Sequence, residues 1–187
     1  MVPRSPNSGF GLRATSGRSL RLGLVLPYHD EGMELSPTGL GRSPFGELLA
    51  APAARGHQVR GFQLAPKAGR VELGQATVEL VPSSGLLRLA ALALHRQAPR
   101  YAASYYEPAW RLTGALRRWR PRLVHSAGLT MDLNLALTAA GARQIGSPLM
   151  VHFHGGEPQA DPWTLSLRRS NARSAARVLF THREQAR

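Results

Sequence analysis

The sequence predicts an α/β fold built on a Rossmann-like, doubly wound parallel sheet. Three observations support this. From residue 20 onward, short apolar runs alternate with longer helical segments. The run at residues 149–153 is nearly continuous, as in parallel strands buried on both faces. Glycine, proline or histidine follows several of these runs, which places turns at the strand ends.

The first predicted strand covers residues 20–26, and a Gly- and Pro-rich loop follows at 29–42. Ser43 and the proline after it begin a helix, because serine caps N-termini and proline suits the first helical position. Gly56 ends this helix, and Pro52 inside it predicts a kink. Further strands are predicted at 58–64, 77–81, 122–126, 149–153 and 177–180, and further helices at 86–95, 105–118, 131–143 and 163–175.

Composition restricts the function classes. The 187 residues suit one domain with a real core, and the absence of cysteine excludes disulfides and thiolate metal sites. No apolar run approaches the roughly 20 residues of a membrane span. The formal charge of +13 comes almost entirely from arginine and favours an anionic partner. Residues 1–19 form a basic segment without acids, predicted to be a disordered tail.

Polar or glycine-rich residues follow four predicted strands, where an open parallel sheet binds its ligands. Gly39 and Gly41 precede a helix N-terminus, so free N–H groups there would attract an anion. The spacing is neither the dinucleotide fingerprint nor a P-loop. Two histidines, His125 and His154, face the same crevice, but no third ligand stands at useful spacing, so no metal is expected.

Six segments carry a family resemblance, in order: Leu22-Gly23-Leu24-Val25-Leu26-Pro27, Gly39-Leu40-Gly41, Ala54-Arg55-Gly56-His57-Gln58-Val59, Pro121-Arg122-Leu123-Val124-His125-Ser126, Pro148-Leu149-Met150-Val151-His152-Phe153-His154-Gly155 and Ala176-Arg177-Val178-Leu179-Phe180-Thr181. Together they resemble the amino-terminal domain of family 4 glycosyltransferases, over about residues 20–187. These are retaining GT-B enzymes, in which two Rossmann-like domains face each other across a cleft. The resemblance implies no metal and no cofactor, with the nucleotide-sugar as substrate.

The resemblance also assigns residues. Gly39, Leu40 and Gly41 match the glycine pair near the donor diphosphate, although Leu40 departs from that pair. His154 matches the histidine near the donor sugar and is the expected catalytic residue. Backbone N–H groups near residues 39–42 would stabilise the charge that builds on the leaving diphosphate. The acceptor and sugar cleft is expected at His125, Gly155, Gly156 and Glu157.

The expected function is therefore sugar transfer from a nucleotide-sugar to an acceptor hydroxyl. The carboxyl-terminal donor domain is absent from residues 1–187, so we expect these residues to be inactive alone and to need that domain or a separate subunit. The expected location is the cytoplasm, peripheral on the inner face of the membrane.

Eight arginines between residues 86 and 122, with Trp110 and Trp119, predict a basic amphipathic surface for anionic lipid. The alternative is a packed helix whose tryptophans face the sheet. The competing function is a non-catalytic basic domain that binds a lipid surface or nucleic acid. No helix-turn-helix, zinc or RRM signature is present, so no nucleic-acid partner is expected.

Overall fold

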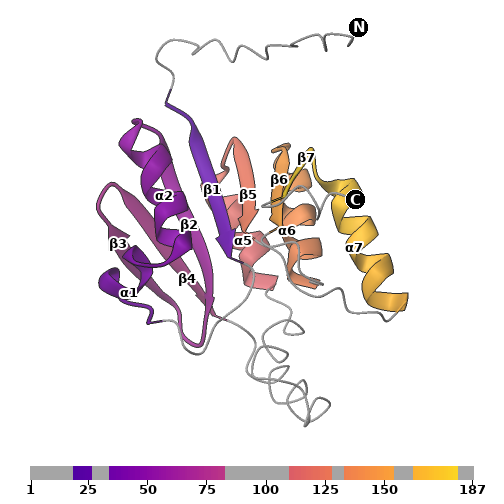
Figure 1. Cartoon of the computed structure of the whole chain (residues 1–187), viewed down its shortest axis with the longest axis horizontal. Coiled ribbons are helices and arrows are strands. Elements are labelled where there is room, and N and C mark those ends of the chain that lie inside the picture. Colours follow the sequence, from indigo (N-terminus) through magenta and orange to yellow (C-terminus); the bar gives the residue numbers. More distant parts are fainter. Residues whose placement is uncertain (1–18, 27–33, 83–109, 128–132, 154–161, 181–187) are drawn as a thin grey trace, which may run out of the picture.

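The computed structural model describes residues 19–26, 34–82, 110–127, 133–153 and 162–180. Their strands form one sheet in the order β3-β4-β2-β1-β5-β6-β7 (Figure 1). All neighbouring strands are parallel except β3 and β4, which form an antiparallel pair. The strands are β1 (Arg21–Leu26), β2 (Gln58–Ala65), β3 (Gly69–Leu73), β4 (Ala76–Pro82), β5 (Leu123–Ala127), β6 (Leu149–Phe153) and β7 (Arg177–Phe180).

Helices cover both faces of the sheet. On one face, α1 (Pro37–Gly41) and α2 (Pro44–Ala54) contribute Leu40 and Leu49 to a core that contains Leu24 of β1. On the other face, α5 (Trp110–Trp119) and α6 (Leu133–Gln144) pack on a core that contains Val25 of the same strand. Adjacent residues of β1 therefore point to opposite cores. The last described helix, α7 (Pro162–Ser174), lies beside α6 (Figure 1). The predicted doubly wound α/β fold is confirmed.

Every predicted strand is present, and the predicted helices at α2, α5, α6 and α7 are confirmed within their described residues. The predicted helix at 86–95 and nearly all of the predicted tail at 1–19 lie outside the described residues. The helix α2 continues through Pro52, and the kink at this residue stays a prediction.

Two elements were not predicted. β3 pairs with β4 through the two-residue loop Gly74-Gln75, in which Gly74 has a φ of 58°. A glycine at the first position of a two-residue loop suits a hairpin, because only glycine adopts positive φ without cost. The second element, α1, lies inside the predicted loop 29–42. Ser36 caps it, with its hydroxyl accepting a hydrogen bond from the Gly39 N–H at 3.1 Å.

The two tryptophans of α5 differ in environment. Trp119 is half-buried against the core, with its ring 6.2 Å from the fully buried Phe62. The Arg60 guanidinium lies 5.2 Å from the Trp119 ring, and Glu79 binds both Arg60 and Arg118. Burial lowers the pKa of Arg60, and Glu79 opposes that shift. Trp110, in contrast, is 62% exposed, so only one of the two tryptophans faces the sheet.

Candidate functional site

The junction between α1 and α2 is built from two consecutive Ser-Pro caps. Ser36 caps α1, and the Ser43 hydroxyl accepts from the Gly46 N–H at 3.1 Å while it donates to the Leu40 carbonyl at 2.6 Å. Because α2 ends just before β2 begins, its N-terminus lies at the opposite, carboxyl-terminal edge of the parallel strands. Figure 1 shows α1 at the end of the sheet toward which β1 runs. The junction thus places Gly41 where ligands bind in this class of fold.

The three glycines of this junction have different surroundings. A Cβ on Gly39 would stand 2.6 Å from the Cβ of Glu34 and would overlap the Glu34 carbonyl oxygen. A Cβ on Gly46 would overlap the Leu40 carbonyl oxygen. A Cβ on Gly41 would meet no atom within 4 Å, and Gly41 is exposed. Gly39 and Gly46 are therefore required for packing, whereas Gly41 leaves open space above the backbone.

The expectation of free N–H groups along residues 39–42 needs correction. The Gly39 N–H binds the Ser36 hydroxyl, the Leu40 N–H binds the Ser36 carbonyl at 2.9 Å, and the Arg42 N–H binds the Thr38 carbonyl at 3.2 Å. The reason is that α1 forms where a loop was predicted, and a helix uses its own donors. The Leu40 side chain is fully buried in the core. The assignment of Gly39, Leu40 and Gly41 to the donor diphosphate stays a prediction, and Gly41 is its most accessible member.

The side chain of Arg42 is a candidate anion-binding group that was not identified from the sequence. It directly follows Gly41, closes α1 and is exposed. Among the described residues, no acidic side chain pairs with it. Its position immediately after Gly-Leu-Gly was the signal available in the sequence, since a guanidinium there can bind the anion that an open glycine turn admits.

His125 lies on the face of the sheet rather than at its edge. It sits two residues before the end of β5, is only 9% exposed, and lines an apolar hollow of about 340 Å³ with residues that include Leu24 and Met150. Its ring stacks on that of His152, with 5.8 Å between centroids. The position of His125 in the cleft stays a prediction, and the contact that the structure describes for its ring is the stack on His152.

The remaining predicted site residues, His154, Gly155, Gly156 and Glu157, lie outside the described residues. β6 ends at Phe153, the residue before His154, so the described strand leads directly to them. Within the described ranges, no three His, Asp or Glu side chains gather as a metal site would require. None of the described helices has the length and apolar character needed to cross a membrane.

The fold and the junction define a Rossmann-like domain whose ligand edge is formed by the carboxyl ends of parallel strands. The sequence profile of the glycosyl transferase 4-like domain matches residues 38–187. The chain therefore belongs to this glycosyltransferase family, as the sequence motifs predicted. A search of curated proteins found no match.

The solved structures that are similar to the chain include two remote ones. One is a nicotinamidase from Staphylococcus aureus, with 14% identity, a TM-score of 0.40, and coverage of 86% of this chain and 99% of that one. The other is an α,α-trehalose 6-phosphate synthase from Burkholderia multivorans, with 16% identity and a TM-score of 0.39. That alignment covers 84% of this chain and 37% of the synthase.

Proposed function

We propose that this domain is the acceptor-side half of a retaining, metal-independent glycosyltransferase. It would act in the transfer of a hexosyl-type sugar from a nucleotide-sugar to an acceptor hydroxyl. Membership of the glycosyl transferase 4-like family supports the transferase class. The observation that carries the site proposal is the open backbone at Gly41, followed by the exposed guanidinium of Arg42.

The proposed role of this junction is to hold the donor diphosphate. A diphosphate gains negative charge as the glycosidic bond breaks, so a nearby cation stabilises the transition state more than the ground state. The open side of Gly41 lets a phosphate oxygen approach the backbone, and Arg42 supplies a planar pair of donors. The N-terminus of the 11-residue helix α2, two residues further on, adds a favourable dipole.

The role of His154 on the sugar side rests on the family resemblance, and the roles of Gly155, Gly156 and Glu157 rest on their position after a strand. His154 would orient the donor sugar as the catalytic residue, and Gly155, Gly156 and Glu157 would line the acceptor cleft. His125 would support this cleft through its stack on His152, which lies two residues before His154 in the chain. Because the bound reactants would already be oriented, the entropic cost of bringing them together would not add to the reaction barrier.

The resemblance also supports the proposed partners and location. A carboxyl-terminal domain or a separate subunit would supply most of the nucleotide contacts, so residues 1–187 by themselves would show little transfer. The proposed location is cytoplasmic and peripheral on the inner face of the membrane. No cofactor besides the nucleotide-sugar substrate is proposed.

Saturation-transfer NMR with UDP-glucose and GDP-mannose tests the donor site, because this method detects weak binding to a single wall of a cleft. Arg42→Gln should lower the affinity for the preferred donor about tenfold, as for loss of one charge-assisted contact. Gly41→Ala should also lower this affinity, because its Cβ fills the space through which a phosphate oxygen would approach the backbone. Arg55→Gln is the matched control, since Arg55 is also an exposed arginine and lies elsewhere in the fold, after the end of α2. If the two site variants bind the nucleotide-sugar as the wild-type chain does, the donor-site assignment is wrong.

A further inference from the structure

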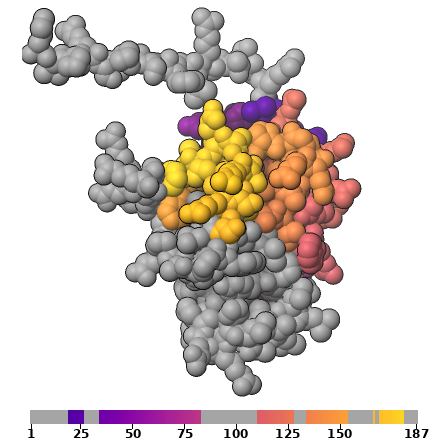
Figure 2. All heavy atoms as spheres, turned by 90° about the vertical axis from the view of Figure 1, so that its right-hand side faces the viewer, coloured from indigo at the N-terminus to yellow at the C-terminus, as the bar shows by residue number. Residues whose placement is uncertain are grey.

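A second basic site lies on the helical surface, away from the α1–α2 junction. An open hollow of about 640 Å³ lies along α6 and α7, lined by Arg143, Ser166, Arg169, Ser170, Arg173 and Ser174. Figure 2 shows that these two helices together form one outer face of the molecule. Arg143 stands in the last turn of α6 and Arg173 in the last turn of α7, next to the points where β6 and β7 begin. The hollow is therefore displaced toward the amino-terminal edge of the sheet.

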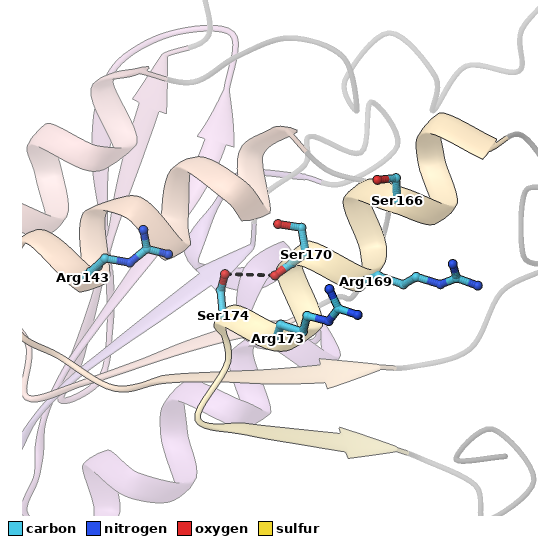
Figure 3. Close-up of a pocket in the computed structure, with 6 residues that line it drawn as sticks. All are labelled: Arg143, Ser166, Arg169, Ser170, Arg173 and Ser174. Atoms are coloured by element: carbon cyan, nitrogen blue, oxygen red, sulfur yellow. Dashed lines mark hydrogen bonds between the residues drawn. The ribbon is translucent and has the colours of Figure 1, made fainter.

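The lining of this hollow follows from the helical repeat. Ser166, Ser170 and Ser174 are spaced by four residues, so their side chains form one row along α7. In Figure 3 the serine hydroxyls lie on the side of α7 that faces Arg143, and Arg169 and Arg173 extend from the other side of the row. The Ser174 hydroxyl donates to the Ser170 carbonyl at 2.9 Å. Among the described residues, the hydroxyls of Ser166 and Ser170 have no such partner, so both can donate to a ligand.

The charge of this groove is positive and uncompensated within the described part of the chain. Neither α6 nor α7 contains an acidic residue. Ion pairs among the described residues form at Arg60, Arg70 and Arg118, and not at the arginines of the groove. Each helix C-terminus carries roughly −0.5 of a charge. Two such ends offset about one of the three arginines, so a net charge of about +2 remains.

The basic surface continues onto α5. A neighbouring hollow of about 470 Å³ is lined by Arg117, Arg118, Arg120, Gln144 and others, and Gln144 directly follows Arg143. Arg118 binds Glu79 at 2.8 Å, but Arg117 and Arg120 have no acidic partner within the described ranges. The residues that line the hollow between α6 and α7 are all arginines and serines, so this hollow is suited to contact anions.

We propose that the groove between α6 and α7 binds phosphoryl groups, and that several are bound side by side along the α5–α6–α7 surface. One guanidinium group can donate to two phosphate oxygens at once, and the serine hydroxyls add neutral donors. The same chemistry is presented by phospholipid head groups and by free phosphate esters. This inference is independent of the donor site at Gly41.

The test uses the whole chain with two probes: vesicles of phosphatidylglycerol and phosphatidylcholine, and inorganic pyrophosphate. Vesicle flotation at low salt and isothermal titration with pyrophosphate would be measured for the wild type and for Arg143→Gln/Arg173→Gln. One basic residue near an anionic surface contributes about fivefold in binding constant, so the double variant should bind these vesicles about 25-fold less well. Arg55→Gln/Arg70→Gln removes the same charge from exposed positions elsewhere and should change binding less than about twofold.

The two probes separate the sources of phosphate. Groove-dependent binding to vesicles alone supports lipid head groups, and groove-dependent binding to both probes supports recognition of the phosphoryl group itself. Equal weakening by the two double variants would overturn the proposal, because binding would then follow net charge rather than the groove. Failure of the wild type to bind either probe would also overturn it. Circular dichroism of both variants confirms that each is folded.

Discussion

Replacement of Gly46 by alanine tests whether packing at the α1–α2 junction outweighs helix propensity. Gly46 lies in the first turn of α2, where alanine would ordinarily stabilise the helix by about 1 kcal/mol. At this position, however, a Cβ would overlap the Leu40 carbonyl oxygen and stand 3.0 Å from the Cα of Gly41. Both neighbours are backbone atoms, so α1 must move, and such overpacking costs about 1–3 kcal/mol.

The net expectation is a loss of up to about 2 kcal/mol, with a fall in Tm of up to about 8 °C for a domain of this size. Gly114→Ala in α5 is the matched control, because its Cβ would meet only the Arg118 Nη1 atom at 3.6 Å. That variant should instead gain up to about 1 kcal/mol. Thermal unfolding followed by circular dichroism measures both. A rise in Tm for Gly46→Ala that equals the rise for Gly114→Ala would refute the packing argument for this junction.

Substitutions at three further positions have expected effects on stability. Ser43→Ala removes the hydroxyl that caps α2 and should cost about 1 kcal/mol in urea unfolding, whereas Ser43→Asp, which keeps a capping oxygen, should cost less. Gly74→Ala places a Cβ at a φ of 58° in the β3–β4 loop and should lower stability by about 1–2 kcal/mol, and an unchanged urea midpoint would contradict the loop conformation. Glu79→Gln removes the shared partner of Arg60 and Arg118 and should destabilise by about 1 kcal/mol at low salt, with a smaller difference at 1 M salt if the effect is electrostatic.

The main elements could be predicted because the hydrophobic pattern and the capping signals agreed. Ser43 and Pro44 gave the start of α2 correctly, and Gly56, with a φ of 81°, follows its end. The same Ser-Pro signal occurs at Ser36, yet α1 was missed. Its helix has only five residues, too few to show a 3.6-residue repeat, and only Leu40 faces the core. The cap alone was the available evidence.

β3 was missed for a related reason. The strand is at the edge of the sheet, only Val71 of its five residues is buried, and two of the others are charged. A half-exposed edge strand has a weak pattern, and the turn at Gly74 was the stronger signal. Recognition of that turn would have changed the prediction from a single strand at 77–81 to a hairpin.

The site was less predictable because strand position and side-chain direction are separate facts. His125 was placed at a strand end from its neighbours in sequence, but β5 continues to Ala127. Side chains alternate along a strand, so His125 shares its face with Leu123 and points into the apolar hollow. Likewise, the glycines at 39 and 41 were treated alike, although one contacts the backbone of Glu34 and the other faces open space. Only three-dimensional packing separates these two roles.

The two edges of the sheet therefore differ in chemistry for a topological reason. The helices α2, α6 and α7 each connect two parallel neighbouring strands, so their N-termini lie at the carboxyl edge of the strands and their C-termini lie at the amino edge. Cations in the last turns, such as Arg143 and Arg173, are thus favoured by the helix dipoles at the amino edge. Dipole compensation alone explains about half a charge per helix, and the arginines of the groove exceed it. The remaining positive charge of the groove is available to bind an anionic partner. Because this charge is displaced from the carboxyl edge, a partner bound in the groove would not block the proposed donor site at Gly41.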